Sequence, residues 1–231
     1  MGVYLGLMII GGVFTVIGMV ISNRLKSTFK KYERLSMSNG MSGAEVAKAM
    51  LRHYGIHDVR IVEGQGFLSD HYNPRSRTIS LSPAVFGGRN VSAAAVAAHE
   101  CGHAVQHAEA YSMLEMRSML VPIVNISATM QQYLFTAAFL FVGMFNNNIV
   151  LLIAIAIFAV TALFSVVTLP VEFDASKRAL AWLDNSNTTN AAEYKGAKDA
   201  LWWAAMTYVS AALAAVIKVL YLVMMFLNNR D

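Results

Sequence analysis

Cysteine and charged residues are scarce in this 231-residue chain, and each scarcity restricts what the protein can be. A single cysteine, Cys101, excludes an intramolecular disulfide and agrees with a reducing compartment. Charged residues make up only 14% of the chain, whereas hydrophobic residues make up 56%, and the mean hydropathy is +0.49. Internal repeats and low-complexity tracts are absent. This composition excludes an ordinary soluble domain and predicts a mainly α-helical, multi-pass membrane protein.

Four stretches of the sequence are apolar and long enough to cross a hydrocarbon core, which requires about 20 residues. We expect transmembrane helices at residues 3–22, 119–145, 149–169 and 204–227. The first lacks the positive residues of a signal peptide and is interpreted as a retained anchor. The second and fourth are less pure, because they contain Pro122, Asn125, Gln131, Gln132 and Lys218.

Positive residues indicate which side of the membrane each loop occupies. They gather directly after the first predicted span, and cytoplasmic segments carry such an excess of Lys and Arg. With four spans, residues 23–118 and 170–203 lie on one face and hold every Lys and Arg except Lys218 and Arg230. The sequence pI near 9.2 then follows from membrane topology, so we expect no nucleic-acid partner.

This topology divides the chain into five expected parts. Residues 1–22 form an N-terminal transmembrane anchor, and residues 23–118 form a cytoplasmic segment. Residues 119–169 form a transmembrane hairpin whose uncharged turn, 146–148, lies outside the cell. A second cytoplasmic segment at 170–203 precedes a C-terminal transmembrane helix and tail at 204–231.

The first cytoplasmic segment contains an H-E-x-x-H pattern at residues 99–103, set among alanines and valines. A helix capped by Ser92 is expected there, because no proline interrupts residues 92–109. Residues four apart share one helical face, so His99 and His103 could bind a single zinc ion, with Glu100 as general base rather than ligand. The alternative is a chance match whose polar side chains are merely solvated, but burial in an apolar helix disfavours it.

A catalytic zinc ion takes three protein ligands and leaves one position for water, so a third ligand must lie elsewhere. His107 is eight residues from His99, about 12 Å along a helix, and is too distant to share the ion. Glu172 follows Pro170, which is expected to begin a new helix, and the topology places it on the same membrane face. We therefore expect one Zn²⁺ bound by His99, His103 and Glu172. The alternative is that Glu172 only favours the positive end of its helix.

The segment before the H-E-x-x-H helix predicts a small α+β unit of zincin type. Ser42 and Glu45 form a capping box that begins a short helix. Residues 58–63 and 77–82 alternate as two strands, which we expect to form a hairpin. Residues 78–82 are a candidate free edge for binding an extended substrate, although a purely structural hairpin is an equal alternative.

A polar turn is expected between the two strands, at Asp70, His71 and Tyr72, ending at Pro74. His71 or Tyr72 is a candidate donor to the oxyanion that develops on a substrate carbonyl, and His71 is the catalytic candidate we name. The alternative is that these side chains are only solvated.

Three motifs resemble a known family: residues 69–76 (Ser-Asp-His-Tyr-Asn-Pro-Arg-Ser), residues 96–109 around the H-E-x-x-H pattern, and residues 169–176 (Leu-Pro-Val-Glu-Phe-Asp-Ala-Ser). The chain resembles, over nearly its whole length, the neutral zinc metallopeptidases of the YugP type, which are bacterial multi-pass membrane proteins. The resemblance implies a membrane-embedded zinc peptidase with ligands His99, His103 and Glu172 and catalytic Glu100.

A more distant similarity connects the chain to membrane gluzincins such as the HtpX heat-shock protease and the CAAX prenyl protease. Their third ligand belongs to an E-x-x-x-D pattern whose Asp orients a ligand histidine. Ser176 takes the place of that Asp here, so the similarity implies that either Ser176 or Asp174 has this role.

The predicted function is hydrolysis of peptide bonds, with a peptide or a membrane protein as substrate and the active site on the cytoplasmic side of the cell membrane. An oligomer or a partner subunit stays open. The alternative is a membrane scaffold or adaptor with a structural or regulatory zinc site closed by His107 or Cys101. A metal transporter is disfavoured, because Lys218 is the only charged residue within the predicted spans.

Overall fold

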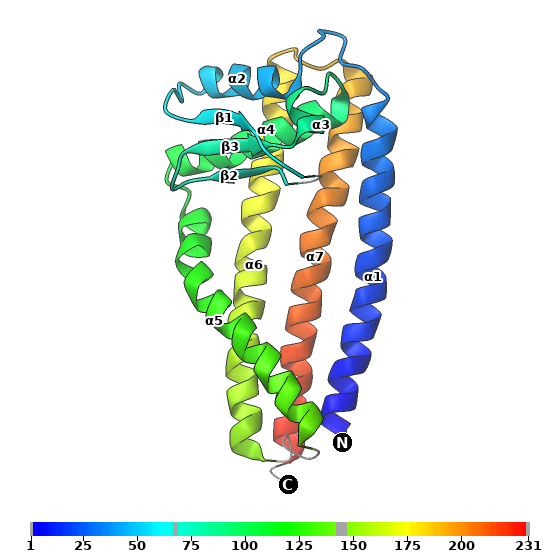
Figure 1. The fold of residues 1–231 in the computed structure, drawn as a ribbon, viewed down its shortest axis with the longest axis vertical. Coiled ribbons are helices and arrows are strands. Elements are labelled where there is room, and N and C mark those ends of the chain that lie inside the picture. Colours follow the sequence, from blue (N-terminus) through cyan, green and yellow to red (C-terminus); the bar gives the residue numbers. More distant parts are fainter. Residues whose placement is uncertain (1, 67–68, 142–146, 230–231) are drawn as a thin grey trace. The chain divides into compact units, whose positions relative to one another are not determined.

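The structure is a computed structural model in which residues 2–66, 69–141 and 147–229 are described (Figure 1). The protein is a mainly α-helical, multi-pass membrane protein with a small mixed sheet. Its elements in chain order are α1 (Gly2–Glu33), α2 (Gly43–His53), β1 (Arg60–Glu63), β2 (His71–Asn73), β3 (Thr78–Leu81), α3 (Pro83–Phe86), α4 (Val91–Ala108), α5 (Ser112–Leu140), α6 (Asn148–Asn185) and α7 (Ala191–Asn228).

The chain divides into two compact units. The first, here called the helical unit, comprises Met1–Val20, Met116–Leu169 and Thr207–Asp231. The second, here called the mixed unit, comprises Ile21–Glu115 and Pro170–Met206. All candidate metal ligands belong to the mixed unit.

The helical unit is built from apolar parts of four helices. One core cluster of buried apolar side chains comes from α1, α6 and α7, namely Leu7, Leu151, Ala154, Phe158 and Leu222. Gln131 of α5 donates a hydrogen bond from its Nε2 to Thr161 Oγ1 of α6 at 2.6 Å. This contact satisfies a polar group that would be costly to leave unpaired in an apolar environment.

Three helices in the described part of the chain are long and apolar enough to cross a membrane: α1, α6 and α7. They contain three of the four predicted spans. The remaining one, 119–145, is not among them, because the described part of this stretch within α5 contains Pro122, Asn125, Gln131 and Gln132. Residues 142–145 of that predicted span, and residue 146 of the predicted turn, lie outside the described residues.

Helix α6 corrects the prediction that Pro170 begins a new helix. The helix is continuous from Asn148 to Asn185, with Pro170 in its interior. A proline removes one backbone donor, but burial of the following turns holds the helix together. Val171, Ala175 and Ala179 are all fully buried on the side of α6 that faces the mixed unit's core.

Helix α4 forms the centre of the mixed unit, and nearly all of its residues are buried. Its N-cap is Asn90, whose Oδ1 accepts a hydrogen bond from Ala93 N at 2.9 Å. The prediction of Ser92 as the N-cap is wrong, because the Ser92 hydroxyl instead donates a hydrogen bond to Phe29 O of α1 at 2.8 Å. Asn90 and Ser92 are both good N-cap residues, and the contact of Ser92 with α1 leaves Asn90 as the cap.

The sheet differs from the predicted hairpin. Its strand order is β1-β3-β2, with β1 parallel and β2 antiparallel to β3. The first predicted strand therefore does not form a hairpin with the second, and residues 78–82 are not a free edge, because β3 is central. Ile79 and Leu81 of β3 are fully buried. The hairpin is formed instead by β2 and β3, and the expected polar turn at 70–72 includes a strand.

Short-range predictions for the mixed unit are confirmed where they depend on local chemistry. Ser42 and Glu45 form the capping box of α2: Ser42 N donates to Glu45 Oε2 at 2.7 Å, and Glu45 N donates to Ser42 Oγ at 3.3 Å. The buried side of α2 packs on α4 (Figure 1). Helix α4 is thus held from one side by α2, which leaves its histidine face for α6.

Candidate metal centre

Close packing of α4 on α6 brings the candidate ligands together. A Cβ atom at Gly102 would lie 2.5 Å from the carbonyl oxygen of Ala175, so only glycine fits between the two backbones. Gly102 separates the two histidines of the H-E-x-x-H pattern, and Ala175 lies three residues after Glu172. The small residues therefore allow side chains of the two helices to meet at short range.

Three ligand atoms converge at this contact. The Nε2 atoms of His99 and His103 lie 3.3 Å and 3.7 Å from Glu172 Oε2. One ligand atom from each of the three residues falls within 4.8 Å of the other two. The side chains are 14%, 11% and 3% exposed, in the order His99, His103 and Glu172. Two imidazoles and a carboxylate are a donor set typical of catalytic zinc.

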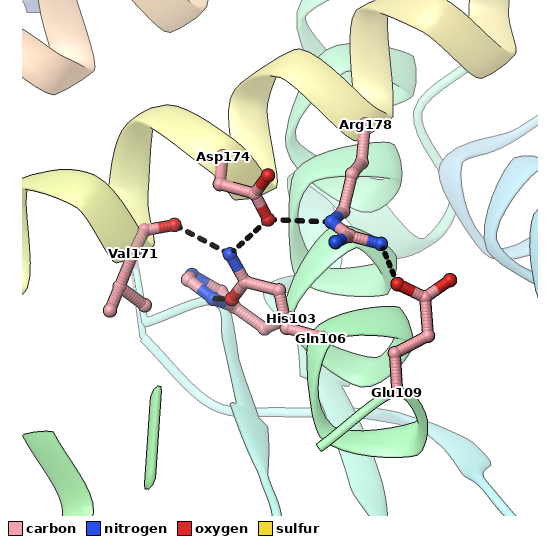
Figure 2. Close-up of polar contacts among 6 residues, drawn as sticks. All are labelled: His103, Gln106, Glu109, Val171, Asp174 and Arg178. Atoms are coloured by element: carbon pink, nitrogen blue, oxygen red, sulfur yellow. Dashed lines mark hydrogen bonds and ion pairs between the residues drawn. The ribbon is translucent and has the colours of Figure 1, made fainter. Parts of the chain in front are cut away.

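The ring of His103 is held by a hydrogen-bonded network that Figure 2 shows. Gln106 Nε2 donates to Val171 O and to Asp174 Oδ2, both at 2.8 Å. Because its amide nitrogen is used by these two acceptors, Gln106 presents its Oε1 to His103 Nδ1 at 3.0 Å. His103 Nδ1 must then carry the proton, which leaves the Nε2 lone pair free to face Glu172.

The network continues outward to the surface. Asp174 Oδ2 accepts a second hydrogen bond, from Arg178 Nε, at 2.5 Å. Arg178 also donates to Glu109 Oε2 at 2.5 Å, which connects α6 to the end of α4 (Figure 2). The ion pair of Arg178 and Asp174, together with the neutral amide of Gln106, therefore fixes the orientation of one candidate ligand, His103.

His99 is held in a simpler way. Its Nδ1 lies 3.1 Å from Ser176 Oγ on α6, one helical turn after Glu172. The resemblance to gluzincins left open whether Ser176 or Asp174 orients a ligand histidine. In the structure each contributes, Ser176 by touching His99 directly and Asp174 by fixing Gln106 beside His103.

Electrostatics at the cluster favour a cation. Burial lowers the pKa of His103, but the contact with Glu172 and the charges of Glu100 and Glu172 outweigh burial, and the net pKa is raised. Both outer imidazole nitrogens have partners, and the inner nitrogens face a buried carboxylate. This arrangement fits a divalent metal ion, which replaces the proton that the site would otherwise attract.

Glu100 and Cys101, the two residues after His99, have different surroundings. Glu100 is buried, and none of the hydrogen bonds or ion pairs found in the described ranges involves its carboxylate. It is not one of the three clustered ligands, in line with the predicted role as base rather than ligand. Cys101 is fully buried against α2, its Sγ 3.5 Å from Ala47 O, and burial raises the pKa of its thiol.

The other predicted site residues lie apart from the three ligands. His71 is on the exposed side of β2, and its Nδ1 lies 2.8 Å from Ser69 O. Tyr72 points the other way, and its hydroxyl lies 2.7 Å from His107 Nδ1 on α4. His107 thus joins β2 to α4, and Tyr72 rather than His71 is the strand residue that forms this contact.

Gln106, the residue that fixes His103, was not among the site residues predicted from the sequence. One signal was present in the sequence: Gln106 is an amide three residues after His103 in a helix rich in alanine and valine, and the structure buries it fully. A buried amide requires hydrogen-bond partners, and those partners lie 65 and 68 residues away in sequence. Their position could not be known before α6 was placed beside α4.

The chain is similar in sequence to proteins described as peptidases. The chain is 39% identical, over 209 residues, to the protein named "Putative membrane protease YugP" of Bacillus subtilis (strain 168), and the alignment covers 90% of this chain and 91% of that protein. No solved structure matches the chain. The sequence also matches, over residues 7–227, a family described as "Putative neutral zinc metallopeptidase", and the chain belongs to this family.

Proposed function

We propose that the protein is a membrane-embedded zinc peptidase in which His99, His103 and Glu172 hold one Zn²⁺ ion and Glu100 is the general base. The observation that carries this proposal is the convergence of three ligand atoms within 4.8 Å, with each outer imidazole nitrogen in contact with another side chain. The membership of a zinc metallopeptidase family supports the same reading.

Zinc, when bound, would polarise a substrate carbonyl and lower the pKa of water to about 7. Glu100 lies between the two histidines in sequence, on the same helix, and its buried carboxylate is not engaged by another side chain in the described part of the protein. It can therefore accept the proton released from the attacking water and pass it to the leaving amine.

The alternative of a scaffold with a structural zinc site receives no support from the described residues. Such a site would be closed by a fourth protein ligand, and we named His107 and Cys101 as candidates. Cys101 faces α2 and His107 contacts Tyr72, so neither belongs to the cluster. Three ligands leave a position for water, as hydrolysis requires.

We propose that an extended substrate binds at β2. Residues 78–82, the segment predicted for this role, contain the central strand β3 and therefore have no free edge. Among the described residues, only β3 pairs with β2, so the other side of β2 is an edge of the sheet. Tyr72 of β2 contacts α4 one turn beyond His103. An extended peptide added to β2 would therefore run beside the proposed zinc-binding helix. Peptide segments of membrane proteins are the substrate class that suits a membrane-embedded enzyme.

The contact between His99 and Glu172 also restricts the membrane topology. Both residues must lie on one side of the bilayer, yet α6 crosses it before reaching Glu172. A second crossing is therefore required between α4 and α6, and α5 is the helix in this interval. We propose four crossings, with the metal centre on the cytoplasmic side that the Lys and Arg distribution indicates.

Cysteine labelling tests this topology. Cys101 is buried, so an added thiol at exposed Ser76 or Asn185 can be followed separately. We expect a membrane-impermeant maleimide to label Ser76→Cys and Asn185→Cys only after the cells are opened, and Asn147→Cys in intact cells. Labelling of Ser76→Cys and Asn185→Cys from opposite sides would contradict the proposal.

Metal content and peptide cleavage test the chemistry. The purified full chain is expected to bind one zinc ion and to cleave casein or an unstructured peptide. Glu172→Ala should lose zinc and cleavage together, whereas Glu100→Gln should keep zinc and lose cleavage by a factor of about 100 or more, because general base catalysis typically contributes that much.

Glu63→Gln is the matched control, because Glu63 is exposed on β1 and outside the cluster. Full cleavage by Glu100→Gln would contradict the catalytic role. Full zinc content in Glu172→Ala would contradict the ligand assignment, and zinc without any cleavage in the unmodified protein would favour the structural alternative.

A further inference from the structure

An apolar groove lies between α6 and α7 within the mixed unit, with a volume of about 330 Å³. Buried Leu201 and Ala205 of α7 are among the residues that line it. Phe173 and Trp202 also line it and are 39% and 54% exposed. Large apolar side chains that stay exposed around a groove indicate a binding surface.

Two lysines, Lys177 of α6 and Lys198 of α7, line the same groove. Neither ammonium group takes part in any hydrogen bond or ion pair found among the described residues. Two nearby acidic residues have other partners: Asp174, three residues before Lys177, accepts from Arg178, and Asp199, next to Lys198, accepts from Tyr32 at 2.6 Å. The groove therefore combines apolar walls with two lysines that form no ion pair among the described residues.

Both helices place the aromatic residue nearer to their apolar run than the lysine. On α6, Phe173 comes first after the apolar run and Lys177 follows one turn later. On α7, Lys198 comes first and Trp202 follows one turn later, just before the apolar run of that helix. Each helix thus presents an aromatic ring at the end nearer its own apolar run and a lysine one turn farther away.

We propose that this groove binds an anionic phospholipid, with the phosphate between Lys177 and Lys198 and the start of an acyl chain along Phe173, Leu201 and Trp202. Aromatic side chains next to apolar helices and lysines beyond them match the levels of the lipid interface and the head group. The site is separate from the three metal ligands, and the proposal does not depend on zinc chemistry. Ser176 is the one residue shared, since it lines the groove and contacts His99.

The observations favour a lipid over an acidic peptide. A peptide would need backbone hydrogen bonds or several polar partners, whereas the groove offers few polar side chains besides the two lysines. A free phosphate would use the lysines but not the apolar walls. An anionic lipid uses both features at once.

Native mass spectrometry of the full chain in a neutral detergent tests the proposal directly. Phosphatidylglycerol, phosphatidylcholine of equal chain length and glycerol phosphate are added in separate titrations. We expect one phosphatidylglycerol to bind about 10-fold or more tightly than phosphatidylcholine, and glycerol phosphate not to bind measurably. The double variant Lys177→Ala with Lys198→Ala should lose this preference.

The matched control is Lys48→Ala with Lys195→Ala, which removes the same charge from exposed positions outside the groove. Equal binding of the two lipids, or equal loss of phosphatidylglycerol in the control and the groove variant, would overturn the proposal. Tight binding of glycerol phosphate, or of a short leucine and glutamate peptide without the lipid, would overturn it in favour of another ligand.

Tryptophan fluorescence gives a second readout that does not depend on the lysine variants. Phosphatidylglycerol with brominated acyl chains should quench the unmodified protein more than Trp202→Phe, because Trp202 lines the groove. Identical fractional quenching in both would contradict the placement of the acyl chain. Zinc content is measured on every sample, so failure of the metal centre is distinguished from failure of the lipid site.

Discussion

The two histidines of the metal centre lie one helical turn apart on α4, yet their surroundings differ. His103 is oriented by Gln106, which is itself fixed by Val171, Asp174 and, through Asp174, Arg178. His99 is oriented by one neutral hydroxyl, that of Ser176. His103 is therefore held by a network that includes charged side chains. His99 is held by a single contact with Ser176, which also lines the groove between α6 and α7.

This difference indicates how strictly each ligand is positioned. A histidine whose partner can rotate or accept alternative bonds retains some freedom, whereas Gln106 has both ends of its amide committed. We therefore expect zinc affinity to depend strongly on Gln106 and weakly on Ser176. The following predictions test that order.

The largest effect is expected from Gly102→Ala, which acts on both sides at once. The added methyl group would lie 2.5 Å from Ala175 O, so α4 and α6 must move apart. Overpacking of this kind costs about 1–3 kcal/mol, and the shift also separates both histidines from Glu172. We expect zinc affinity, measured by competition with a chelator, to fall about 100-fold or more.

Gly18→Ala is the control for this change, because a Cβ at that position of α1 has no atom within 4 Å. It should leave zinc affinity unchanged. Circular dichroism of both variants shows whether the helices remain intact. Normal zinc affinity in Gly102→Ala would contradict the importance of the close helix packing.

The next largest effect is expected from Gln106→Leu. Leucine has a similar size but leaves the Nδ1 proton of His103 without an acceptor and removes two donors from Val171 and Asp174. Loss of a residue that orients a metal-bound histidine typically costs 10–100-fold in affinity. The upper part of that range is expected here, because the site is buried, with exposed Gln65→Leu as control. A loss of zinc affinity below about 3-fold would contradict the expected difference between the surroundings of His103 and those of His99.

Local sequence chemistry was enough to predict the helix that carries His99 and His103 and to name the candidate ligands. The H-E-x-x-H spacing indicated His99, Glu100 and His103, and Glu172 was named from its place after Pro170, with support from the membrane-side argument. The capping box at Ser42 and Glu45 is equally local. These predictions depend on spacings of a few residues or on the count of apolar runs, and the structure brings the three proposed ligands together.

The features that escaped prediction depend on contacts between distant segments. The parallel pairing of β1 with β3 joins segments that are 18 residues apart, and strand β2, which pairs with the other side of β3, has only three residues, too few for a pattern to identify it from the sequence. Pro170 was expected to begin a helix, but burial of Val171 and its neighbours keeps α6 continuous. Asn90 and Ser92 are equally good caps until α1 lies beside α4.

A smaller effect is expected from Ser176→Ala, the counterpart of the glutamine change on the other side of the centre. The variant removes the hydroxyl that contacts His99 Nδ1 at 3.1 Å but leaves no charged group unpaired. We expect an affinity loss of about 10-fold or less, at the low end of the range for such contacts. Ser186→Ala, at the exposed residue directly after the end of α6, is the control. A loss as large as that of Gln106→Leu would show that both histidines are equally constrained.

The smallest effect is expected at the outer end of the charged network, where Glu109 accepts from Arg178. The Glu109 side chain is 53% exposed, whereas those of Arg178 and Asp174 are 21% and 25% exposed. Exposed ion pairs contribute about 0–1 kcal/mol, and Asp174 alone keeps Arg178 in place. Glu109→Gln should therefore change zinc affinity by less than about 3-fold in the same chelator competition. If the loss approached that of Gln106→Leu, the orientation of His103 would depend on the whole chain of contacts to the surface, and the difference between the two sides would be larger than the buried contacts explain.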